Sequence, residues 1–388
     1  MNVGIVCEYN PLHLGHKKQL AAIRRRFGPE TGIVCAMSGN FVQRGAPAMF
    51  DKTLRAAAAV ECGADLVVEL PLNVCLSSAE GYAAGAVAVL EKLCGAICFG
   101  CETGDAQALM AAARALLSGE FPPLLKEELA RGSSFPAARQ RALEKMGLPA
   151  EILRRPNDIL AVEYCKVILS QGLGLEIFPI RRQGDYHADT ADPQNPSATA
   201  VRELLRTGRD WKRFVPPEAA AILEGAPIHT LEAGERAILY RLRTMTEAEL
   251  QSLPYGGEGL WRKLLHAREE ENTLEDILTA VKSKRYTRTR LDRMVLCALL
   301  GLSRERMEAG APWARVLAFN DRGRAILRGA RDREFFPNAG QSLPGPQGDL
   351  ERRAGDVYGL FAETKPEPPG AERRRRVYYQ TKGEHPLL

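Results

Sequence analysis

VGIVCEYNPLHLGH (residues 3–16) joins a short apolar run to a pair of histidines through a proline turn. The apolar run predicts a buried strand, Pro11 disfavours helix just before it, and His13 opens a helix. A helix start offers unpaired N–H groups and partial positive charge, so phosphate binds there, and Gly15 permits close approach. His13 and His16 add donors that can follow charge onto a reacting phosphorus. A histidine pair that merely caps a surface helix is the alternative, but the preceding strand and turn favour nucleotidyl transfer.

The chain has 388 residues, which predicts two domains or one larger domain with an added module. Hydrophobic residues make up 45% and charged residues 26%, as in globular proteins with a substantial core. No apolar run reaches the roughly 18 residues that span a bilayer, and the N-terminus lacks the pattern of a secretion signal. We therefore expect a cytoplasmic protein without a membrane partner. Nine cysteines, an odd number, fit reduced thiols better than a disulfide framework.

Short apolar runs alternate with helical patterns over the first half of the chain, which is typical of a parallel sheet wrapped by helices. The runs predict strands over residues 3–7, 32–37, 66–70, 96–100 and 175–180. The patterns between them predict helices over residues 15–26, 51–62, 79–93, 106–117 and 135–146, with a further helix starting at residues 155–158. Ligands bind at the carboxyl ends of the strands in such a sheet. The loops after Cys7, Met37, Leu70 and Gly100 are therefore the expected site.

The sequence pattern changes near residue 206. Residues 101–174 form a mostly helical insertion before the last predicted strand, and strand signals fade after residue 206. Residues 211–227 contain prolines and are a candidate linker, and helices with few β-rich runs follow. Proline and glycine are frequent in residues 338–370, which indicates loop-like parts there. The expected domains are thus 1–206 and 207–388.

A second candidate phosphate site is NPSATAVR (residues 195–202), where a proline and hydroxyl residues open a helix. Ser197 can cap that helix. Ser197, Thr199 and Arg202 can also hold the β- and γ-phosphates of ATP. Taken alone, the segment favours an ordinary N-cap beside a surface arginine. Together with the two histidines, it favours phosphate binding.

These segments resemble the paired motifs of nucleotidyltransferases related to class I aminoacyl-tRNA synthetases, although Asn10 stands where related adenylyltransferases usually carry aspartate. More narrowly, five blocks resemble the bacterial tRNA(Met) cytidine acetate ligase family. The blocks are residues 4–11 (GIVCEYNP), 37–45 (MSGNFVQRG), 63–71 (GADLVVELP), 155–160 (RPNDIL) and 285–287 (RYT). The resemblance implies an α/β fold, with a Rossmann-like parallel-sheet nucleotidyltransferase domain followed by a mainly α-helical C-terminal region.

The resemblance also implies a reaction and its site. In that reaction acetate attacks the α-phosphate of ATP to form acetyl-adenylate, and N4 of the wobble cytidine of elongator tRNA(Met) takes the acetyl group. By the same resemblance His13 and His16 would be catalytic, and Mg²⁺ would accompany the ATP. The implied ATP-binding residues are Cys7, Glu8, Tyr9, Asn10, His13, Gly15, His16, Leu20, Gly100, Asn157, Arg182, Ser197, Thr199 and Arg202.

The polar loop at residues 38–45 carries one cation at the expected ligand edge of the sheet. Asn40, Gln43 and Arg44 are candidates for the acceptor side, where a carboxylate or the target base docks. A loop satisfied by its own backbone is the alternative. The next helix opens with charged residues on one face, which fit surface ion pairs as well as site residues: Asp51, Lys52 and Arg55.

Cys94, Cys98 and Cys101 have the spacing of the iron–sulfur motif of radical enzymes that use S-adenosylmethionine. Cys98, however, lies within the apolar run 96–100, whereas a cluster loop needs exposed backbone. Buried free cysteine is a common small core residue, and the ligases that the chain resembles commonly have serine in place of Cys101. We therefore expect no metal at these cysteines.

The segment KSKRYTRTRLDR (residues 282–293) contains six cationic side chains, one carboxylate and one tyrosine. Lysine and arginine meet backbone phosphates, and an aromatic ring can stack on an unpaired base, so RNA is the expected partner. The resemblance to the ligase family implies that this RNA is elongator tRNA(Met). A solvated helix face is the simpler alternative. A second basic cluster, residues 373–376 followed by Tyr378 and Tyr379, can extend this surface. The RNA-binding candidates are Lys282, Lys284, Arg285, Tyr286, Arg288, Arg290 and Arg293.

Two other functions remain open from the residues. A cofactor adenylyltransferase acting on a small phosphorylated acceptor would leave the basic segment at residues 282–293 without a purpose. A non-catalytic tRNA-binding protein would not need the intact set of His13, His16 and Arg202. The sequence indicates no oligomeric state.

Overall fold

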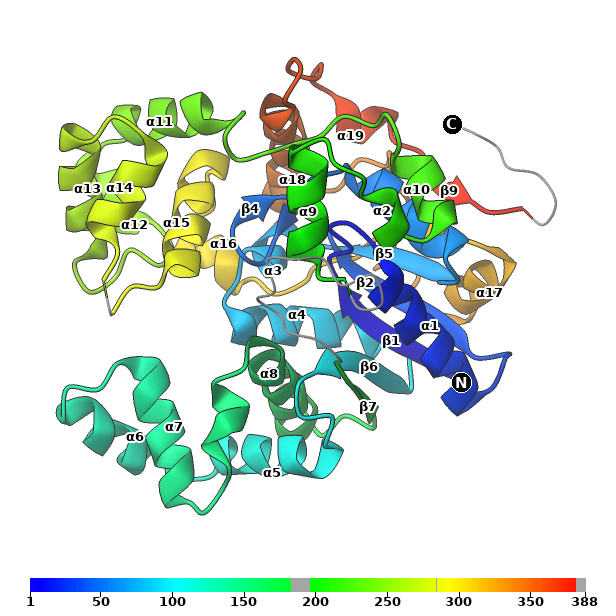
Figure 1. Cartoon of the computed structure of the whole chain (residues 1–388), viewed down its shortest axis with the longest axis horizontal. Helices are drawn as coiled ribbons and strands as arrows, with labels where there is room; N and C mark the ends of the chain where they lie inside the picture. The colour runs from blue at the N-terminus through cyan, green and yellow to red at the C-terminus, as the bar shows by residue number, and fades with distance from the viewer. Residues whose placement is uncertain (183–195, 284, 382–388) are drawn as a thin grey trace.

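A computed structural model describes residues 1–182, 196–283 and 285–381 of the chain (Figure 1). Within these residues, seven strands form one mixed sheet in the order β7-β6-β1-β2-β5-β8-β9. The strands are β1 (Asn2–Cys7), β2 (Gly32–Ser38), β5 (Leu66–Leu70), β6 (Ala96–Cys101), β7 (Glu176–Arg181), β8 (Arg315–Phe319) and β9 (Tyr378–Tyr379). A separate hairpin pairs β3 (Phe41–Val42) with β4 (Ala46–Pro47).

The five strands from β1 to β7 in this sheet run parallel, as their apolar runs predict. All five predicted strands are confirmed, with each end within one residue of the prediction. The chain passes outward from β1 to β2 and β5 and then crosses back to β6 and β7 on the other side. β1 therefore lies beside the point where the strand order reverses, which is the usual place of a ligand site in an open α/β sheet.

Helices cover both faces of this sheet (Figure 1). Val34, Leu66 and Ile97 point from the strands into one core, and Ile5 and Ile33 point into the other, as alternation along a strand requires. The first core is closed by α4 (Ala79–Leu90), α5 (Ala106–Leu117) and α8 (Pro156–Ser170). The second is closed by α1 (Leu14–Phe27), α2 (Lys52–Glu61), α9 (Ala198–Arg206) and α10 (Pro217–Leu223). The predicted helices of the first half are thus confirmed.

Helices α5, α6 (Phe121–Ala130), α7 (Phe135–Lys145) and α8 make up the predicted helical insertion between β6 and β7. A third core lies among helices of the C-terminal half and meets the sheet layer through Phe41, Leu72 and Leu76. Figure 1 shows α6, α7 and the bundle α11–α15 on the same side of the molecule. The other helices are α3 (Leu72–Cys75), α11 (Glu235–Thr244), α12 (Glu247–Ser252), α13 (Leu260–Glu270), α14 (Leu274–Val281), α15 (Arg288–Leu300), α16 (Arg304–Glu308), α17 (Asp321–Gly329), α18 (Gly345–Tyr358) and α19 (Ala371–Arg374).

The C-terminal half is not only helical, because it adds β8 and β9 to the central sheet. β8 pairs antiparallel with β5, and β9 pairs with β8. The sheet therefore contains residues from both sides of position 206, where we expected a domain boundary. The candidate linker at residues 211–227 is not free either, because Phe214 and Leu223 are buried in the core above α2.

The stretch at residues 338–370, which we expected to be loop-like in part, contains the long helix α18. Leu350 and Tyr358 of this helix are buried in the third core, and Tyr358 donates a hydrogen bond to the Ala48 carbonyl at 2.8 Å. The C-terminal segment is thus packed onto the N-terminal domain. Among the described helices, none combines the length and apolar character that crossing a bilayer requires.

Candidate active site

The turn after β1 brings two histidines to the start of α1. His13 is the N-cap of α1, and its Nδ1 accepts a hydrogen bond from the Gly15 N–H at 3.1 Å. The Nδ1 of His16 accepts in turn from the His13 N–H at 3.2 Å. A Cβ at position 15 would lie 2.9 Å from Cε1 of His13, so glycine is needed for this cap. The sequence prediction that a histidine opens this helix is confirmed.

These contacts fix which ring nitrogens face the site. Because each Nδ1 accepts a backbone N–H, the neutral form of each ring carries its proton on Nε2. The rings stack with centroids 3.7 Å apart. Burial, followed by Arg182 and Arg202, lowers the pKa of His13 to about 3. Burial, followed by His13 and Arg182, also lowers the pKa of His16, so both rings are neutral donors near pH 7.

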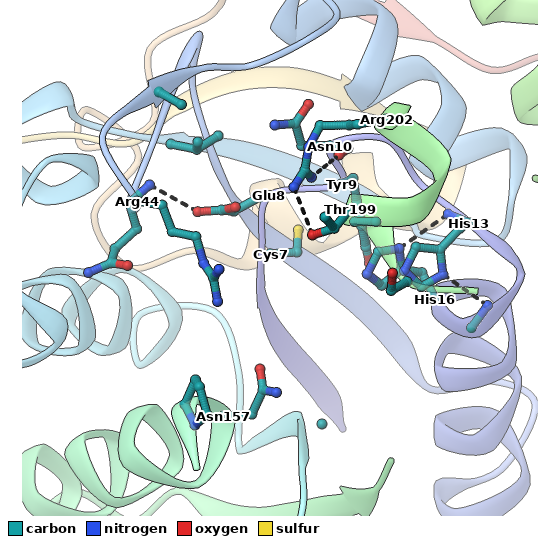
Figure 2. Close-up of a pocket in the computed structure, with 18 of the residues that line it drawn as sticks. Cys7, Glu8, Tyr9, Asn10, His13, His16, Arg44, Asn157, Thr199 and Arg202 are labelled. Carbon is teal, nitrogen blue, oxygen red and sulfur yellow. Dashed lines mark hydrogen bonds between the residues drawn. The ribbon is translucent and has the colours of Figure 1, made fainter. Parts of the chain in front are cut away.

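A pocket with a volume of 1180 Å³ opens at the carboxyl ends of β1, β6 and β7. Figure 2 shows His13 and His16 on one side of it, with Glu8 and Arg44 on the other. It is lined by most of the predicted site residues, namely Cys7, Glu8, Tyr9, Asn10, His13, Gly15, His16, Gln43, Arg44, Gly100, Asn157, Arg182, Ser197, Thr199, Arg202 and Arg288. The predicted strand-end loops after Cys7 and Gly100 thus meet at one pocket.

The motif at residues 195–202 contacts the turn after β1 through Arg202. Its guanidinium donates to the Asn10 carbonyl at 2.8 Å and to Oγ1 of Thr199 at 3.0 Å (Figure 2). Ser197 caps α9 by accepting from the Ala200 N–H at 3.1 Å, which confirms the predicted cap. Two segments almost two hundred positions apart are therefore joined directly at the pocket.

Asn157 stands at the start of α8 and is held by Glu102 at the end of β6. Its amide donates to Oε1 of Glu102 at 2.7 Å, and the Asp158 N–H donates to Oε2 at 2.8 Å. The Asp158 carboxylate in turn accepts hydrogen bonds from the N–H groups of Glu102 and Thr103, both at 2.9 Å. This reciprocal pairing fixes the Asn157 amide at the pocket wall.

Two of the predicted ATP-binding and acceptor-side residues do not line the pocket. Leu20 is buried in the core between α1 and the sheet, because it lies on the inner face of its helix. Asn40 is also buried, and its side chain donates to Asp51 and accepts from the Lys52 N–H. Asn40 therefore supports the start of α2, whereas Gln43 and Arg44 of the same loop reach the pocket.

The basic segment is only partly available to RNA. Tyr286 is 4% exposed and donates its hydroxyl to the Glu258 carbonyl, so its ring offers no face to a base, contrary to our expectation. Arg293 is also buried. Lys282 and Arg285 are exposed, and Lys284 lies outside the described residues. Asn195, the first residue of the second phosphate motif, lies outside them too. Arg288 pairs with Glu275 and Asp292, and Arg290 donates to the Tyr255 carbonyl.

The three cysteines with iron–sulfur spacing do not form a cluster of ligands in the described part of the chain. Cys98 and Cys101 are fully buried, and burial raises the pKa of Cys98 to about 12 and of Cys101 to about 11. Burial also raises the pKa of Cys94. Their thiols therefore stay protonated near neutral pH. No group of three or more metal-binding side chains occurs in the part of the chain that the structure describes.

Sequence reasoning missed Arg55 as a support of the site. The side chain is fully buried and donates to the carbonyls of Glu8 at 2.5 Å, Ser38 at 3.1 Å and Gly39. It thereby ties the end of β1 to the end of β2. Of the two interpretations left open for this charged face, surface ion pairs are excluded, because Lys52 is buried as well. The charged residues on one helix face next to the site were the only sequence signal for this role. The residues that pack over them lie far away in the sequence, so their burial could not be predicted.

The fold and this pocket define a nucleotidyl transferase that places paired histidines at the start of a helix. In agreement, residues 1–368 match a family model described as HIGH Nucleotidyl Transferase. A tRNA(Met) cytidine acetate ligase of Alkaliphilus metalliredigens is 34% identical, covering 92% of this chain and 93% of its own. One of Syntrophomonas wolfei is 37% identical, covering 84% and 83%.

Solved structures agree with these relatives. Apo Thermotoga maritima TmcAL has a TM-score of 0.88 and 30% identity, over 97% of this chain and 99% of that one. TmcAL bound with alpha-thio ATP has a TM-score of 0.86 and 29% identity over the same shares, 97% and 99%. The chain therefore belongs to the tRNA(Met) cytidine acetate ligase family.

Proposed function

We propose that the protein is an ATP-dependent ligase that activates acetate as acetyl-adenylate and transfers the acetyl group to N4 of the wobble cytidine of elongator tRNA(Met). The observation that carries the proposal is the pair of neutral imidazole donors at the start of α1, inside a pocket that also holds the Ser197, Thr199 and Arg202 motif. Similarity to named ligases over most of the chain supports it over a cofactor adenylyltransferase.

In the first step an acetate oxygen attacks the α-phosphorus of ATP, and the bond from that phosphorus to the bridging oxygen breaks, releasing pyrophosphate. The Nε2–H groups of His13 and His16 would donate to the phosphate oxygens as charge shifts, and each such donor is typically worth 10²–10³ in rate. Ser197, Thr199 and Arg202 would hold the terminal phosphates. Asn157, Arg182 and the backbone at Gly100 would contact the remainder of the nucleotide.

In the second step N4 of cytidine attacks the acetyl carbonyl carbon. The bond from that carbon to the AMP oxygen breaks, AMP leaves, and N4 loses one proton. Gln43 and Arg44 line the pocket opposite the histidines and are the acceptor-side residues in this proposal. Exposed cations at Lys282 and Arg285 would meet phosphates of the tRNA. Activity on tRNA would place the protein in the cytoplasm.

We also propose that Mg²⁺ accompanies ATP. The described residues contain no group of three metal-binding side chains, and the pocket offers Glu8 as a carboxylate. This donor set fits Mg²⁺, which proteins usually bind through one or two carboxylates together with substrate phosphates. When bound, the ion would neutralise charge on the phosphates.

The test incubates the purified protein with ATP, isotope-labelled acetate and total tRNA and measures N4-acetylcytidine in the digested tRNA by mass spectrometry. We expect labelled N4-acetylcytidine only when ATP and acetate are both present. We expect it to disappear in His13→Ala and His16→Ala variants. Label that persists in both variants would contradict the assigned activation site, and no label with the unaltered protein would contradict the function.

A further inference from the structure

The pocket is built by both halves of the chain. Besides the residues assigned to ATP in the proposed function, its wall includes Thr230 from the loop after α10, and Arg288, Thr289 and Asp292 from the first turns of α15. The volume of 1180 Å³ exceeds the roughly 300–1,000 Å³ of pockets that hold one small ligand. The pocket therefore has room for a second ligand beside a nucleotide, on the side formed by the C-terminal half.

The β3–β4 turn, residues 42–46, packs directly on α15. Gly45 has a φ of +82°, and a Cβ there would lie 2.5 Å from the Arg293 backbone nitrogen and 2.6 Å from the Asp292 carbonyl carbon. Only glycine permits this approach of the turn to the helix backbone. The turn and the first turns of α15 therefore form one continuous wall.

Arg293 holds this wall together from within. The side chain is 9% exposed, and its Nη1 donates to the Gln43 carbonyl at 3.3 Å. Its guanidinium lies 5.0 Å from the centre of the Tyr255 ring. The Tyr255 hydroxyl donates to the Leu76 carbonyl at 2.6 Å, which anchors that ring to the sheet layer. Arg293 is thus built into a junction and is not placed to meet RNA, contrary to our expectation.

The same turn also contacts the end of β1. The Gln43 N–H donates to Oε1 of Glu8 at 2.9 Å, and the Gln43 side chain donates to the Ser77 carbonyl at 3.2 Å. A chain of direct contacts therefore runs from α15 through Arg293 and Gln43 to Glu8 in the pocket. His13, His16 and Arg202 are not part of this chain and lie across the pocket from Arg44 (Figure 2).

We propose that residues 42–46 and the first turns of α15 form the wall that positions the acceptor pyrimidine base of the RNA, with Arg293 as the positioning residue. The inference rests on the proposed function. The phosphate donors of adenylate formation, His13, His16 and Arg202, lie across the pocket (Figure 2), and Arg293 reaches Glu8 only through the Gln43 backbone. We therefore expect adenylate formation to depend little on Arg293. Acetyl transfer needs N4 of the base aligned with the acetyl carbon, and small displacements of such a wall are costly to rate. Arg293 therefore acts mainly on the second step.

The test separates the two steps. Acetate-dependent exchange of labelled pyrophosphate into ATP measures adenylate formation without RNA, and single-turnover acetylation of tRNA measures transfer. The variants are Arg293→Lys, which loses the planar guanidinium, and Gly45→Ala, which acts from the other side of the same contact. The matched control is Arg268→Lys, because Arg268 likewise donates to backbone carbonyls, those of Leu242 and Met245, but lies away from the turn.

We expect exchange within about twofold of the unaltered protein in all three variants, and transfer at least tenfold slower in Arg293→Lys and Gly45→Ala but not in Arg268→Lys, a ratio of rates set by positioning. The loss should fall on kcat and not on the KM for tRNA. A parallel loss of exchange and transfer, or no loss of transfer in either variant, would overturn the inference. Absence of exchange in the unaltered protein would instead overturn the proposed function.

Discussion

His13 has two separable roles, because its ring uses a different nitrogen for each. Nδ1 caps α1, whereas Nε2–H is available to phosphate. His13→Ala should lose both, which means 10²–10³ in exchange rate and about 1 kcal/mol of stability. His13→Asn should keep the cap and the stability but lose the activity. Pyrophosphate exchange and urea unfolding measure the two effects, with the exposed His266→Ala as control. Full activity in His13→Asn would exclude a donor role for Nε2.

The buried histidines also make stability depend on pH. The pKa of His13 falls from its ordinary value of 6.5 to about 3 in the folded protein. Below pH 6.5 the unfolded chain binds this proton while the folded protein does not, so stability falls as pH falls towards 3. The slope is about 1.4 kcal/mol per pH unit for each such histidine.

His13→Asn should therefore flatten the pH dependence of the free energy of unfolding by about this amount below pH 6. Urea titrations in steps from pH 7 to pH 4 measure it. His266→Asn is the control, because the His266 side chain is 74% exposed. Equal slopes for the unaltered protein and His13→Asn would mean that His13 is protonated in the folded protein.

At the scale of elements, a buried ionic cluster fastens α19 and β8 to the start of α2. Lys52 lies 2.6 Å from Glu69 and 2.8 Å from Glu372, and Arg315 also pairs with Glu372. Burial alone would raise the pKa of Glu372, but Lys52, Arg375 and Arg315 lower it to about 2. This carboxylate contacts all three cations, each of which has a further carboxylate partner: Glu69 for Lys52 and Arg315, and Asp51 for Arg375.

Glu372→Gln keeps the shape of the side chain but removes its charge. It should destabilise the protein by about 3–5 kcal/mol, because it leaves three buried cations, Lys52, Arg315 and Arg375, with one carboxylate fewer. The shift of the urea midpoint measures this effect, and the surface change Glu363→Gln should move the midpoint little. An unchanged midpoint in Glu372→Gln would show that the remaining carboxylates, Glu69 above all, suffice to balance the cluster.

This cluster also shows which parts of the fold and of the site could be predicted from the sequence and which could not. The five parallel strands are continuous apolar runs, so their bounds follow from local pattern. β8 begins with Arg315, and its place beside β5 depends on a partner some 250 positions away. The charges at the start of α2 fit a solvated face as well as a site for the same reason, because their partners Glu69, Glu372 and Arg375 are close only in the fold. The histidine and Ser197 motifs carry local cap signals, so the core of the site was predictable.

At the scale of the whole molecule, the formal net charge of +5 is small and its distribution decides what it attracts. Lys282 and Arg285 are exposed beside α14 and α15, on the side of the molecule that also carries the bundle α11–α15 (Figure 1). Arg328 and Arg331 are equally exposed at α17, on the other side (Figure 1). The pair Arg328 and Arg331 carries the same charge as the pair Lys282 and Arg285 but lies elsewhere on the molecule. It is therefore a matched control for Lys282 and Arg285.

If the first pair meets tRNA phosphates, the double change Lys282→Ala and Arg285→Ala should weaken tRNA binding and reduce the slope of log Kd against log salt. Each lost phosphate contact accounts for about 0.7–0.9 in that slope, so the double variant should lose between one and two. Arg285 also pairs with Glu258 at 3.1 Å, and this competition favours the lower value. Filter binding at a series of salt concentrations measures both quantities. A slope that falls equally in Arg328→Ala with Arg331→Ala would mean that the tRNA contacts the molecule without preference for the helical bundle.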